Sequence, residues 1–264
     1  MNIEGSVAIV TGASSGIGAA TAEALARRGA TIVAVARRAG RLEEVVERCR
    51  ASAPESIAHP GDVSERSFAD DVMRGARERL GRVDILVNNA GISPGENVRE
   101  HAVDDAIAIM NVNFFGAVHF AGAALPGLLA QGRGSIVNLT SVSGAVPAPG
   151  EPAYGASKAA LSRWTHGLAI ELHGTGVHAG VLSPGPIDTE IWQHGSAPYD
   201  GKLYPPSLVA DGVLRMIERE LTQLTVPRRF GAVGAMYPLV GRPMRWGLRK
   251  YGNRGASDAP DGLH

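Results

Sequence analysis

The chain has 264 residues, 44% hydrophobic and 20% charged, as is usual for a soluble globular protein that buries one large α/β core. Its formal net charge is +0, so no overall electrostatic attraction favours nucleic acid as a partner. The single cysteine, Cys49, excludes an intrachain disulfide and gives no sign of an oxidising compartment.

Short β-branched runs alternate with helix-length segments over most of the chain. The runs that predict strands are Ser6–Val10, Thr31–Ala36, Glu55–His59, Val83–Val87, Ser135–Leu139 and Val177–Leu182. The segments that predict helices are Gly16–Arg28, Arg41–Arg50, about 64–80, about 100–131 and Pro152–His173. Near-continuous apolar strands separated by helices indicate a parallel sheet covered on both faces. With right-handed crossovers, the simplest topology is a Rossmann-type, doubly wound parallel sheet in a single α/β domain.

Three glycines stand between the first predicted strand and the first predicted helix, in the run TGASSGIG. Gly12 permits the turn, Gly16 lets the backbone approach a pyrophosphate, and Gly18 lets the helix pack closely on the strand. The N–H groups at a helix N-terminus also attract phosphates. The spacing is GxxxGxG rather than GxGxxG, so a plain strand–helix turn is the alternative. The residues of this turn predicted to bind a dinucleotide are Gly12, Ser14, Ser15, Gly16, Ile17 and Gly18.

The end of the second predicted strand bears on which dinucleotide binds. An acidic residue there would bind a ribose 2′-hydroxyl and select NAD. The strand ends instead at Ala36, and the next residues are Arg37 and Arg38. Because a guanidinium can bind a phosphate through two parallel hydrogen bonds, this pattern favours NADP, although NAD stays possible. Two solvated surface arginines are the alternative.

Tyr154 and Lys158 are four residues apart in a predicted helix, so their side chains share one face. A free tyrosine has a pKa near 10, too high for a good base at neutral pH. A neighbouring ammonium lowers that pKa, and the pair can then act as a general acid and base. Taken alone, the spacing is more typical of a surface pair.

Together these motifs resemble the short-chain dehydrogenase/reductase family in its compact form. The motifs occur in the family's order and spacing: TGASSGIG at 11–18, NNAG at 88–91, Ser141 thirteen residues before Tyr154, YGASK at 154–158 and SPGPIDT at 183–189. The resemblance covers about residues 5–190. It implies an NAD(P)-dependent oxidoreductase that transfers a hydride between the nicotinamide cofactor and a carbonyl or secondary alcohol.

The resemblance also implies a role for each matching residue. Tyr154 would protonate the carbonyl oxygen in reduction and take the hydroxyl proton in oxidation. Lys158 would lower the Tyr154 pKa and bind the nicotinamide ribose, and Ser141 would hold the substrate oxygen. Thr140 and Ser143 are competing hydroxyls beside Ser141.

Asn113, in an N-x-x-G pattern within the long predicted helix, would hold a water that links Lys158 to solvent. A polar residue packed between helices is the alternative. The further residues that the resemblance assigns to the cofactor are Asp62, Val63, Asn89, Ala90, Gly91, Pro184, Gly185, Ile187 and Thr189, besides Tyr154 and Lys158. For Asp62, an ordinary helix N-cap is the alternative.

The C-terminal third has a looser pattern. Residues 190–206 are polar, aromatic and rich in Gly and Pro, which predicts a substrate lid. Residues 226–254 form a basic arm with an apolar helical stripe. Such an arm can lie on an anionic membrane surface or attract an anionic substrate, but packing on the domain or a neighbouring subunit is favoured. We expect one domain over 1–254 and a disordered tail at 255–264.

The expected partners are a small, hydrophobic carbonyl or alcohol substrate and further copies of the chain, as a dimer or tetramer. The eight His are scattered without metal-ligand spacing, so no metal is expected. The first residues lack the pattern of a signal peptide, and no apolar run approaches the ~20 residues that cross a bilayer, so we expect a cytoplasmic protein. Two other functions stay open: epimerisation or dehydration on the same scaffold, and cofactor sensing without catalysis.

Overall fold

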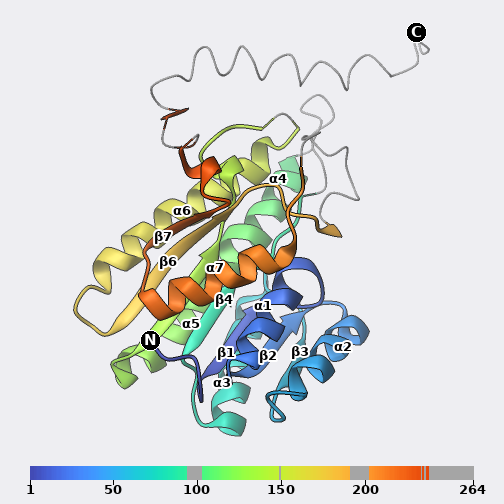
Figure 1. The fold of residues 1–264 in the computed structure, drawn as a ribbon, viewed down its shortest axis with the longest axis vertical. Coiled ribbons are helices and arrows are strands. Elements are labelled where there is room, and N and C mark those ends of the chain that lie inside the picture. The colour runs from blue at the N-terminus through green and yellow to red at the C-terminus, as the bar shows by residue number, and fades with distance from the viewer. Residues whose placement is uncertain (94–102, 149, 191–201, 233, 235, 238–264) are drawn as a thin grey trace.

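In the computed structural model, a seven-stranded parallel sheet runs through the centre of the molecule (Figure 1). The structure describes residues 1–93, 103–148, 150–190, 202–232, 234 and 236–237. The strands are β1 Val7–Thr11, β2 Thr31–Ala36, β3 Ile57–Pro60, β4 Ile85–Asn88, β5 Gly134–Leu139, β6 Val177–Pro184 and β7 Gln223–Val226. Their order across the sheet is β3-β2-β1-β4-β5-β6-β7. The Rossmann-type, doubly wound sheet predicted from the sequence is confirmed.

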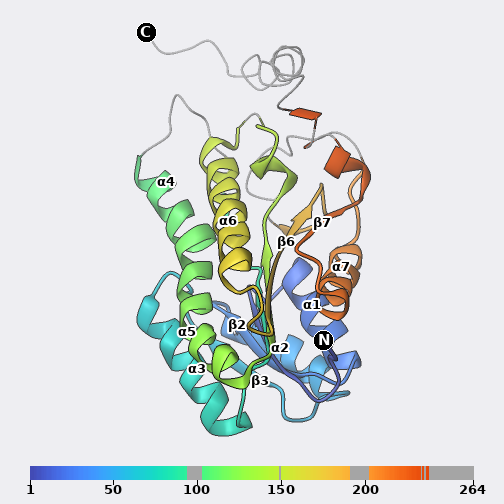
Figure 2. The same cartoon turned by 90° about the vertical axis from the view of Figure 1, so that its left-hand side faces the viewer.

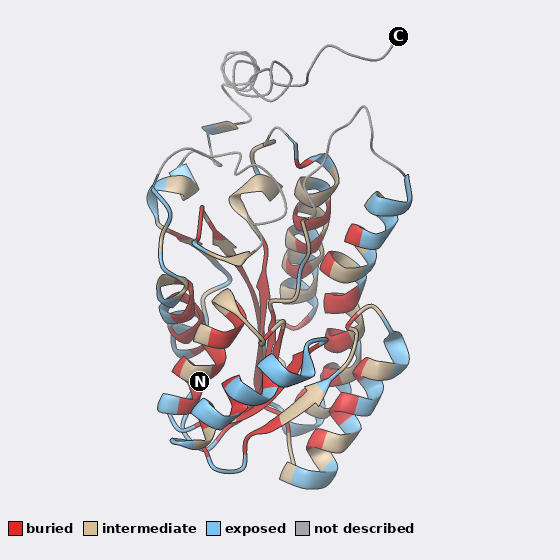
Figure 3. Cartoon of the chain, turned by 90° about the vertical axis from the view of Figure 1, so that its right-hand side faces the viewer, coloured by how far each residue is buried: buried red, intermediate tan, exposed pale blue. Residues whose placement is uncertain are grey.

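The helices form two layers, one on each face of the sheet (Figure 2). One layer holds α1 Gly16–Arg27, α2 Ala39–Arg50 and α7 Pro206–Arg219. The other holds α3 Arg66–Leu80, α4 Val103–Met110, α5 Gly116–Gln131 and α6 Pro152–Glu171. Successive strand side chains point to opposite faces. Ala8 and Val10 therefore pack under the first layer, whereas Val7 and Ile9 pack under the second, and both clusters are buried (Figure 3).

The sheet has one strand more than the six predicted: α7 and β7 follow β6, where the sequence analysis predicts no helix or strand. α7 is amphipathic, and Val209, Val213 and Ile217 are fully buried on its inner side. β7 is a four-residue edge strand that pairs with β6 and has one buried residue, Val226. The predicted ends of the other strands and helices differ from the observed ones by a few residues at most.

The long helix predicted over about 100–131 is interrupted. Its described part consists of α4, a π-helical turn over Asn111–Phe115, and α5. By length and composition, Val103–Gln131 would be able to cross a membrane, which corrects the expectation that no stretch approaches that length. Phe120, Ala124 and Leu128 on α5 are nevertheless fully buried with side chains of α3 and the sheet. We therefore assign this helix to the core of the domain.

Because the strands are parallel, their carboxyl ends meet at one edge of the sheet. The chain leaves β1 towards β2 on one side and returns to pair β4 with β1 on the other. Such a reversal of strand order leaves a crevice at the carboxyl ends. The glycine turn after β1, the NNAG segment at the end of β4 and Ser141 after β5 all lie at this edge.

Two predicted segments lie largely outside the described residues. Of the proposed lid, Glu190 and residues 202–206 are described, and of the basic arm the described part ends at 237. The predicted tail, 255–264, is wholly outside. The Arg229 guanidinium lies over the rings of Tyr204 and Phe230, 5.3 and 5.0 Å from their centroids. This start of the basic arm therefore packs on the domain.

Candidate active site

A cleft of about 910 Å³ opens at the carboxyl ends of the strands, a size typical of ligand-binding sites. Of the predicted catalytic residues, Ser141, Tyr154 and Lys158 line it, whereas Asn113 does not. The predicted cofactor residues that line it are Gly12, Ser14, Ser15, Gly16, Ile17, Arg37, Arg38, Asp62, Val63, Asn89, Ala90, Gly91, Tyr154, Lys158, Pro184, Gly185, Ile187 and Thr189. Gly18 lies outside the cleft, against the turn itself.

The glycine turn leaves its backbone open to a ligand. Gly12 has a φ of +66°, and a Cβ there would lie 2.8 Å from Ala90 Cα. A Cβ on Gly18 would collide with the carbonyl oxygen of Gly12, so this glycine allows α1 to pack closely on β1. Ser15, the N-cap residue of α1, makes no side-chain capping hydrogen bond, so the first-turn N–H groups stay available. The turn therefore fits the pyrophosphate of a dinucleotide.

Asn89 holds this turn in place. Its Nδ2 donates to the carbonyl oxygens of Thr11 at 2.9 Å and Gly12 at 3.2 Å. In return, Thr11 Oγ1 accepts from the backbone N–H groups of Asn89 at 3.0 Å and Ala90 at 3.1 Å. The side chain predicted to contact the cofactor therefore acts as a positioning residue that ties the loop after β4 to the turn after β1.

Ser141, Tyr154 and Lys158 meet inside the cleft. The side chains of Tyr154 and Ser141 are hydrogen-bonded to each other. Lys158, one turn further along α6, is only 4% exposed, and its Nζ lies 5.7 Å from the centroid of the Tyr154 ring. The same Nζ donates to the carbonyl oxygen of Leu139, at the end of β5, at 3.1 Å. A phenol, a hydroxyl and an amine thus share one cavity.

Burial moves the pKa of Tyr154 in the direction opposite to the sequence-based prediction. Burial and then the Glu151 carboxylate raise the pKa of Tyr154, and the hydrogen bond with Ser141 offsets this only in part. Burial also lowers the pKa of Lys158 to about 8, so this amine is still mostly protonated at pH 7 and loses its positive charge just above neutral pH. Tyr154 therefore keeps its proton at neutral pH, whereas the Lys158 amine gains and loses its proton at a pH close to neutral.

Asn113 lies in the π-helical turn and is 1% exposed. Its Oδ1 accepts from Ile92 N at 2.8 Å, and its Nδ2 donates to Ile92 O at 3.0 Å and Ser157 Oγ at 3.1 Å. The side chain thus joins the loop after β4 to α6, as the packing alternative predicts. A Cβ on Gly91 would lie within 3.3 Å of both Lys158 Nζ and Asn113 Oδ1, so the two groups are near each other. The water relay stays a prediction.

The competing hydroxyls beside Ser141 have other partners. Thr140 Oγ1 donates to Leu182 O at 3.2 Å and lies 2.8 Å from Ser183 Oγ. Ser143 Oγ donates to a carboxylate oxygen of Glu151 at 3.1 Å. Of the three hydroxyls, Ser141 is therefore the one placed against Tyr154.

The residues predicted to surround the adenosine part of the cofactor also have specific partners. Arg38 reaches the glycine turn, where its Nη2 donates to Ser15 Oγ at 2.7 Å. Arg37 makes no hydrogen bond or ion pair within the described part of the chain, although it lines the cleft. Asp62 Oδ1 accepts from the N–H of Ser64 at 2.9 Å and its hydroxyl at 2.8 Å. Its side chain thus shapes the loop before α3 but does not cap this helix, whose N-cap residue is Glu65.

Residues 6–199 match the family model described as short chain dehydrogenase. The chain belongs to this family. A ketoacyl reductase, HetN, of Nostoc sp. is 32% identical over 261 residues, covering 92% of this chain and 90% of that protein.

Solved structures of the same family resemble the whole domain. A short chain dehydrogenase/reductase from Burkholderia phymatum, in complex with NAD, has 27% identity and a TM-score of 0.85, covering 92% of this chain and 96% of its own. L-sorbose reductase from Gluconobacter frateurii, in complex with NADPH and L-sorbose, has 28% identity and a TM-score of 0.77, covering 86% and 97%. This short-chain dehydrogenase is therefore a nicotinamide-dependent oxidoreductase of carbonyl and alcohol groups.

Glu151 and Phe230 are among the residues of the short-chain dehydrogenase cleft that sequence-based reasoning missed. Glu151, three residues before Tyr154, is 6% exposed and lines the cleft. Phe230 lines it from beyond β7, where a Cβ on Gly185 would come within 2.9 Å of its ring. The position of Glu151 one turn before the tyrosine was a usable signal, whereas nothing in the sequence near Phe230 indicates its contact with Gly185. Within the described residues, no three His, Cys, Asp or Glu side chains converge as metal ligands.

Proposed function

We propose that this protein is an NADP(H)-preferring reductase or dehydrogenase that interconverts a carbonyl and a secondary alcohol, with Tyr154 as the general acid and base. The hydrogen-bonded pair of Tyr154 and Ser141 in the cleft carries the proposal. Both hydroxyls can reach one substrate oxygen, so Ser141 holds that oxygen while Tyr154 exchanges a proton with it. When bound, the nicotinamide cofactor supplies or accepts the hydride.

The raised pKa of Tyr154 supports the proton-donor role. In reduction, the phenolic proton passes to the carbonyl oxygen as that oxygen gains negative charge. Lys158 then favours the resulting phenolate when its amine is protonated. Because burial places the pKa of Lys158 at about 8, this amine can also gain and lose a proton near neutral pH. In oxidation the same groups act in reverse.

Arg37 and Arg38 support the preference for NADP(H). Both line the cleft after β2, and the strand ends at Ala36 without an acidic residue. Arg37 has no partner within the described residues, so its five N–H donors are available to a 2′-phosphate. Because Arg38 already has several partners, Arg37 is the first residue we assign to this phosphate.

The walls around Tyr154 support a substrate with both apolar and polar groups. Apolar residues that line the cleft include Val142, Val146, Pro147 and Phe230. Ser143 and Glu151, which also line it, provide a hydroxyl and a carboxylate that can bind a hydroxyl group of the substrate. We propose a hydrophobic carbonyl compound that bears such a group.

A homo-oligomer remains part of the proposal. Val103 and Ile107 on α4 and Phe115 in the π-helical turn are 74%, 52% and 44% exposed. Because exposed large apolar side chains favour association, these residues of α4 and the π-helical turn support contact between copies of the chain.

The proposed reaction is tested with a panel of carbonyl and alcohol compounds, each offered with NADPH, NADH and their oxidised forms. The expected result is substrate-dependent oxidation of NADPH, followed as loss of its absorbance, with lower kcat/KM when NADH replaces it. A clear preference for NADH would contradict the assignment of Arg37 alone. Failure to turn over any carbonyl or alcohol with either cofactor would contradict the proposed reaction.

Glu151→Gln is expected to lower the pKa of Tyr154, because it removes the nearby negative charge that opposes the phenolate. Gln can still accept the hydrogen bond from Ser143, so the local structure is retained. Alcohol oxidation needs the phenolate, and its rate rises with pH through this pKa. The pH–rate profile of oxidation should therefore move to lower pH in the variant.

Glu171→Gln provides the matched control for Glu151→Gln. Glu171 is an exposed residue at the far end of α6, remote from Tyr154 along the same helix. Its substitution should leave the pH–rate profile unchanged. A shift of the Glu151→Gln profile to higher pH, or no shift, would show that the carboxylate does not act on the phenol.

A further inference from the structure

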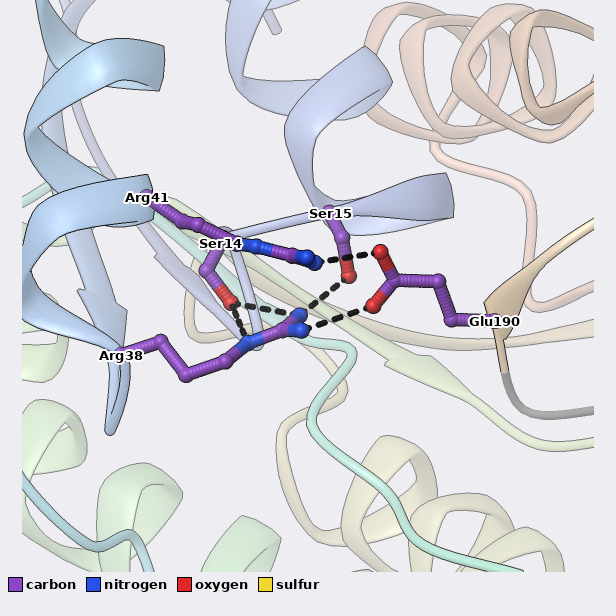
Figure 4. A network of polar contacts seen from close by, with 5 residues as sticks. All are labelled: Ser14, Ser15, Arg38, Arg41 and Glu190. Atoms are coloured by element: carbon purple, nitrogen blue, oxygen red, sulfur yellow. Dashed lines mark hydrogen bonds and ion pairs between the residues drawn. The ribbon is translucent and has the colours of Figure 1, made fainter. Parts of the chain in front are cut away.

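Arg38 is held between two parts of the chain that are far apart in the sequence (Figure 4). Its Nη2 donates to Ser15 Oγ at 2.7 Å and Ser14 Oγ at 3.2 Å, and its Nε donates to Ser14 Oγ at 3.3 Å. Its Nη1 donates to Glu190 Oε2 at 2.7 Å. Arg41, on α2, pairs with the other oxygen of Glu190. A carboxylate from the segment after β6 thus reaches the glycine turn.

The partners of Arg38 differ in how they respond to an incoming phosphate. All three guanidinium nitrogens of Arg38 already donate hydrogen bonds, so a 2′-phosphate must replace or join an existing partner. A serine hydroxyl can turn and donate to the phosphate, because it is both donor and acceptor. A carboxylate can only accept, and it repels the phosphate. Of the groups around Arg38, Glu190 is therefore the one that opposes phosphate binding.

We propose that Glu190 limits the preference for NADP(H): its carboxylate pairs with Arg38 and Arg41, where a 2′-phosphate would otherwise bind, and weakens the binding of NADP(H) relative to NAD(H). This inference rests on the proposed use of NADP(H) at Arg37 and Arg38. The ribose of NAD(H) carries a 2′-hydroxyl, which can donate to a carboxylate. Position 190 thus supplies, from another part of the chain, the carboxylate that is absent at Ala36.

The charge and exposure of the network set the size of the effect. The hydrogen bond from Arg38, together with Arg41, lowers the pKa of Glu190, so the carboxylate stays charged at neutral pH. The side chains of Arg38 and Glu190 are 46% and 36% exposed, so solvent screens their interaction. We therefore expect a modest shift in affinity rather than exclusion of one cofactor.

Glu190→Gln tests the proposal, because Gln keeps the shape and the hydrogen-bond acceptor but removes the charge. NADPH and NADH are titrated separately into the full-length protein without substrate, and Kd is measured by calorimetry. NADPH should bind about fivefold more tightly to the variant. NADH should bind equally well or more weakly. If Glu190 instead orients Arg38 for the phosphate, NADPH binding will weaken, and that result would overturn the proposal.

Two further variants separate the role of Glu190 from general effects of charge. Glu218→Gln removes the partner of Arg28 outside the cleft and should leave both Kd values unchanged. When Arg38 is also replaced by Gln, the substitution Glu190→Gln should increase NADPH affinity much less than it does in the wild type, because the guanidinium for which Glu190 and the phosphate compete is absent. An equal gain with and without Arg38 would contradict competition at this residue. Thermal unfolding of each variant checks that it is folded.

The same titrations distinguish failure of this inference from failure of the proposed cofactor preference. If the wild type binds NADPH well and Glu190→Gln changes nothing, the role of Glu190 is wrong and the preference stands. If the wild type binds NADH better but Glu190→Gln gains NADPH affinity, the preference is wrong and the role of Glu190 stands. If no variant binds either nucleotide, both are wrong.

Discussion

Replacement of Tyr154 by phenylalanine is expected to lower kcat for carbonyl reduction by about 10²- to 10⁴-fold, the usual contribution of a positioned general acid. The variant keeps the ring but loses the phenolic proton and the hydrogen bond with Ser141. NADPH affinity should change little, because the glycine turn and the arginines are untouched. kcat and kcat/KM should therefore fall together, measured with the best carbonyl substrate of the panel.

Tyr204→Phe is the matched control for Tyr154→Phe. Tyr204 stacks with Arg229 and does not line the cleft, and phenylalanine preserves that ring contact. Its kcat should stay close to that of the wild type. If Tyr154→Phe turned over substrate as fast as the wild type, Tyr154 would not be the proton donor.

Most of the fold could be predicted because the central strands are buried on both faces. β1 and β2 are almost entirely buried and therefore appear in the sequence as continuous apolar runs. β7 has a single buried residue and gives no such run. α7 carried a usable signal, since its buried valines recur at helical spacing, whereas the π-helical turn at Asn111–Phe115 arises from contacts that the local sequence does not specify.

The site could be predicted where its chemistry lies in short motifs and not where it depends on tertiary contacts. The glycine turn and the pair of Tyr154 and Lys158 are local patterns. The pKa of Tyr154 depends on burial, which the Tyr–Lys spacing does not reveal. Glu190 meets Arg38 across 152 residues of sequence, so only the folded chain shows that a carboxylate lies beside this arginine.

Lys158→Met is expected to reduce activity by at least about 10²-fold and, at the same time, to stabilise the protein near neutral pH. The folded protein lowers the pKa of Lys158 from 10.5 to about 8, because burial disfavours the ammonium. This shift of the pKa means that burying the charged amine lowers the free energy of unfolding of the wild type by about 3 kcal/mol. Methionine removes this cost but also loses the hydrogen bond to Leu139 O, which lowers the stability of the variant by about 1 kcal/mol.

The sign of this stability effect depends on pH. Below pH 8, Lys158 is protonated in the folded and unfolded states, and the full cost of burying the charge is present. As pH rises from 8 towards 10.5, Lys158 is deprotonated in the folded protein but still protonated in the unfolded chain. The cost of burying its charge therefore falls, and the wild type becomes more stable. The advantage of methionine should therefore be about 2 kcal/mol at pH 7, or about 4–8 °C in Tm, and disappear before pH 10.5, where only the loss of the hydrogen bond to Leu139 O remains.

The predicted gain in stability is checked by thermal unfolding of the wild type and Lys158→Met between pH 7 and 10.5. The predicted loss of activity is checked by kcat measured on the same samples. Lys202→Met is the control, because Lys202 is exposed and its substitution should change stability by less than about 0.5 kcal/mol. If Lys158→Met were more stable than the wild type by the same amount at every pH, the difference would arise from packing rather than from the buried charge. Lower stability at pH 7 would contradict the lowered pKa. A stable but inactive variant would show that Lys158 is retained for catalysis at a cost to folding.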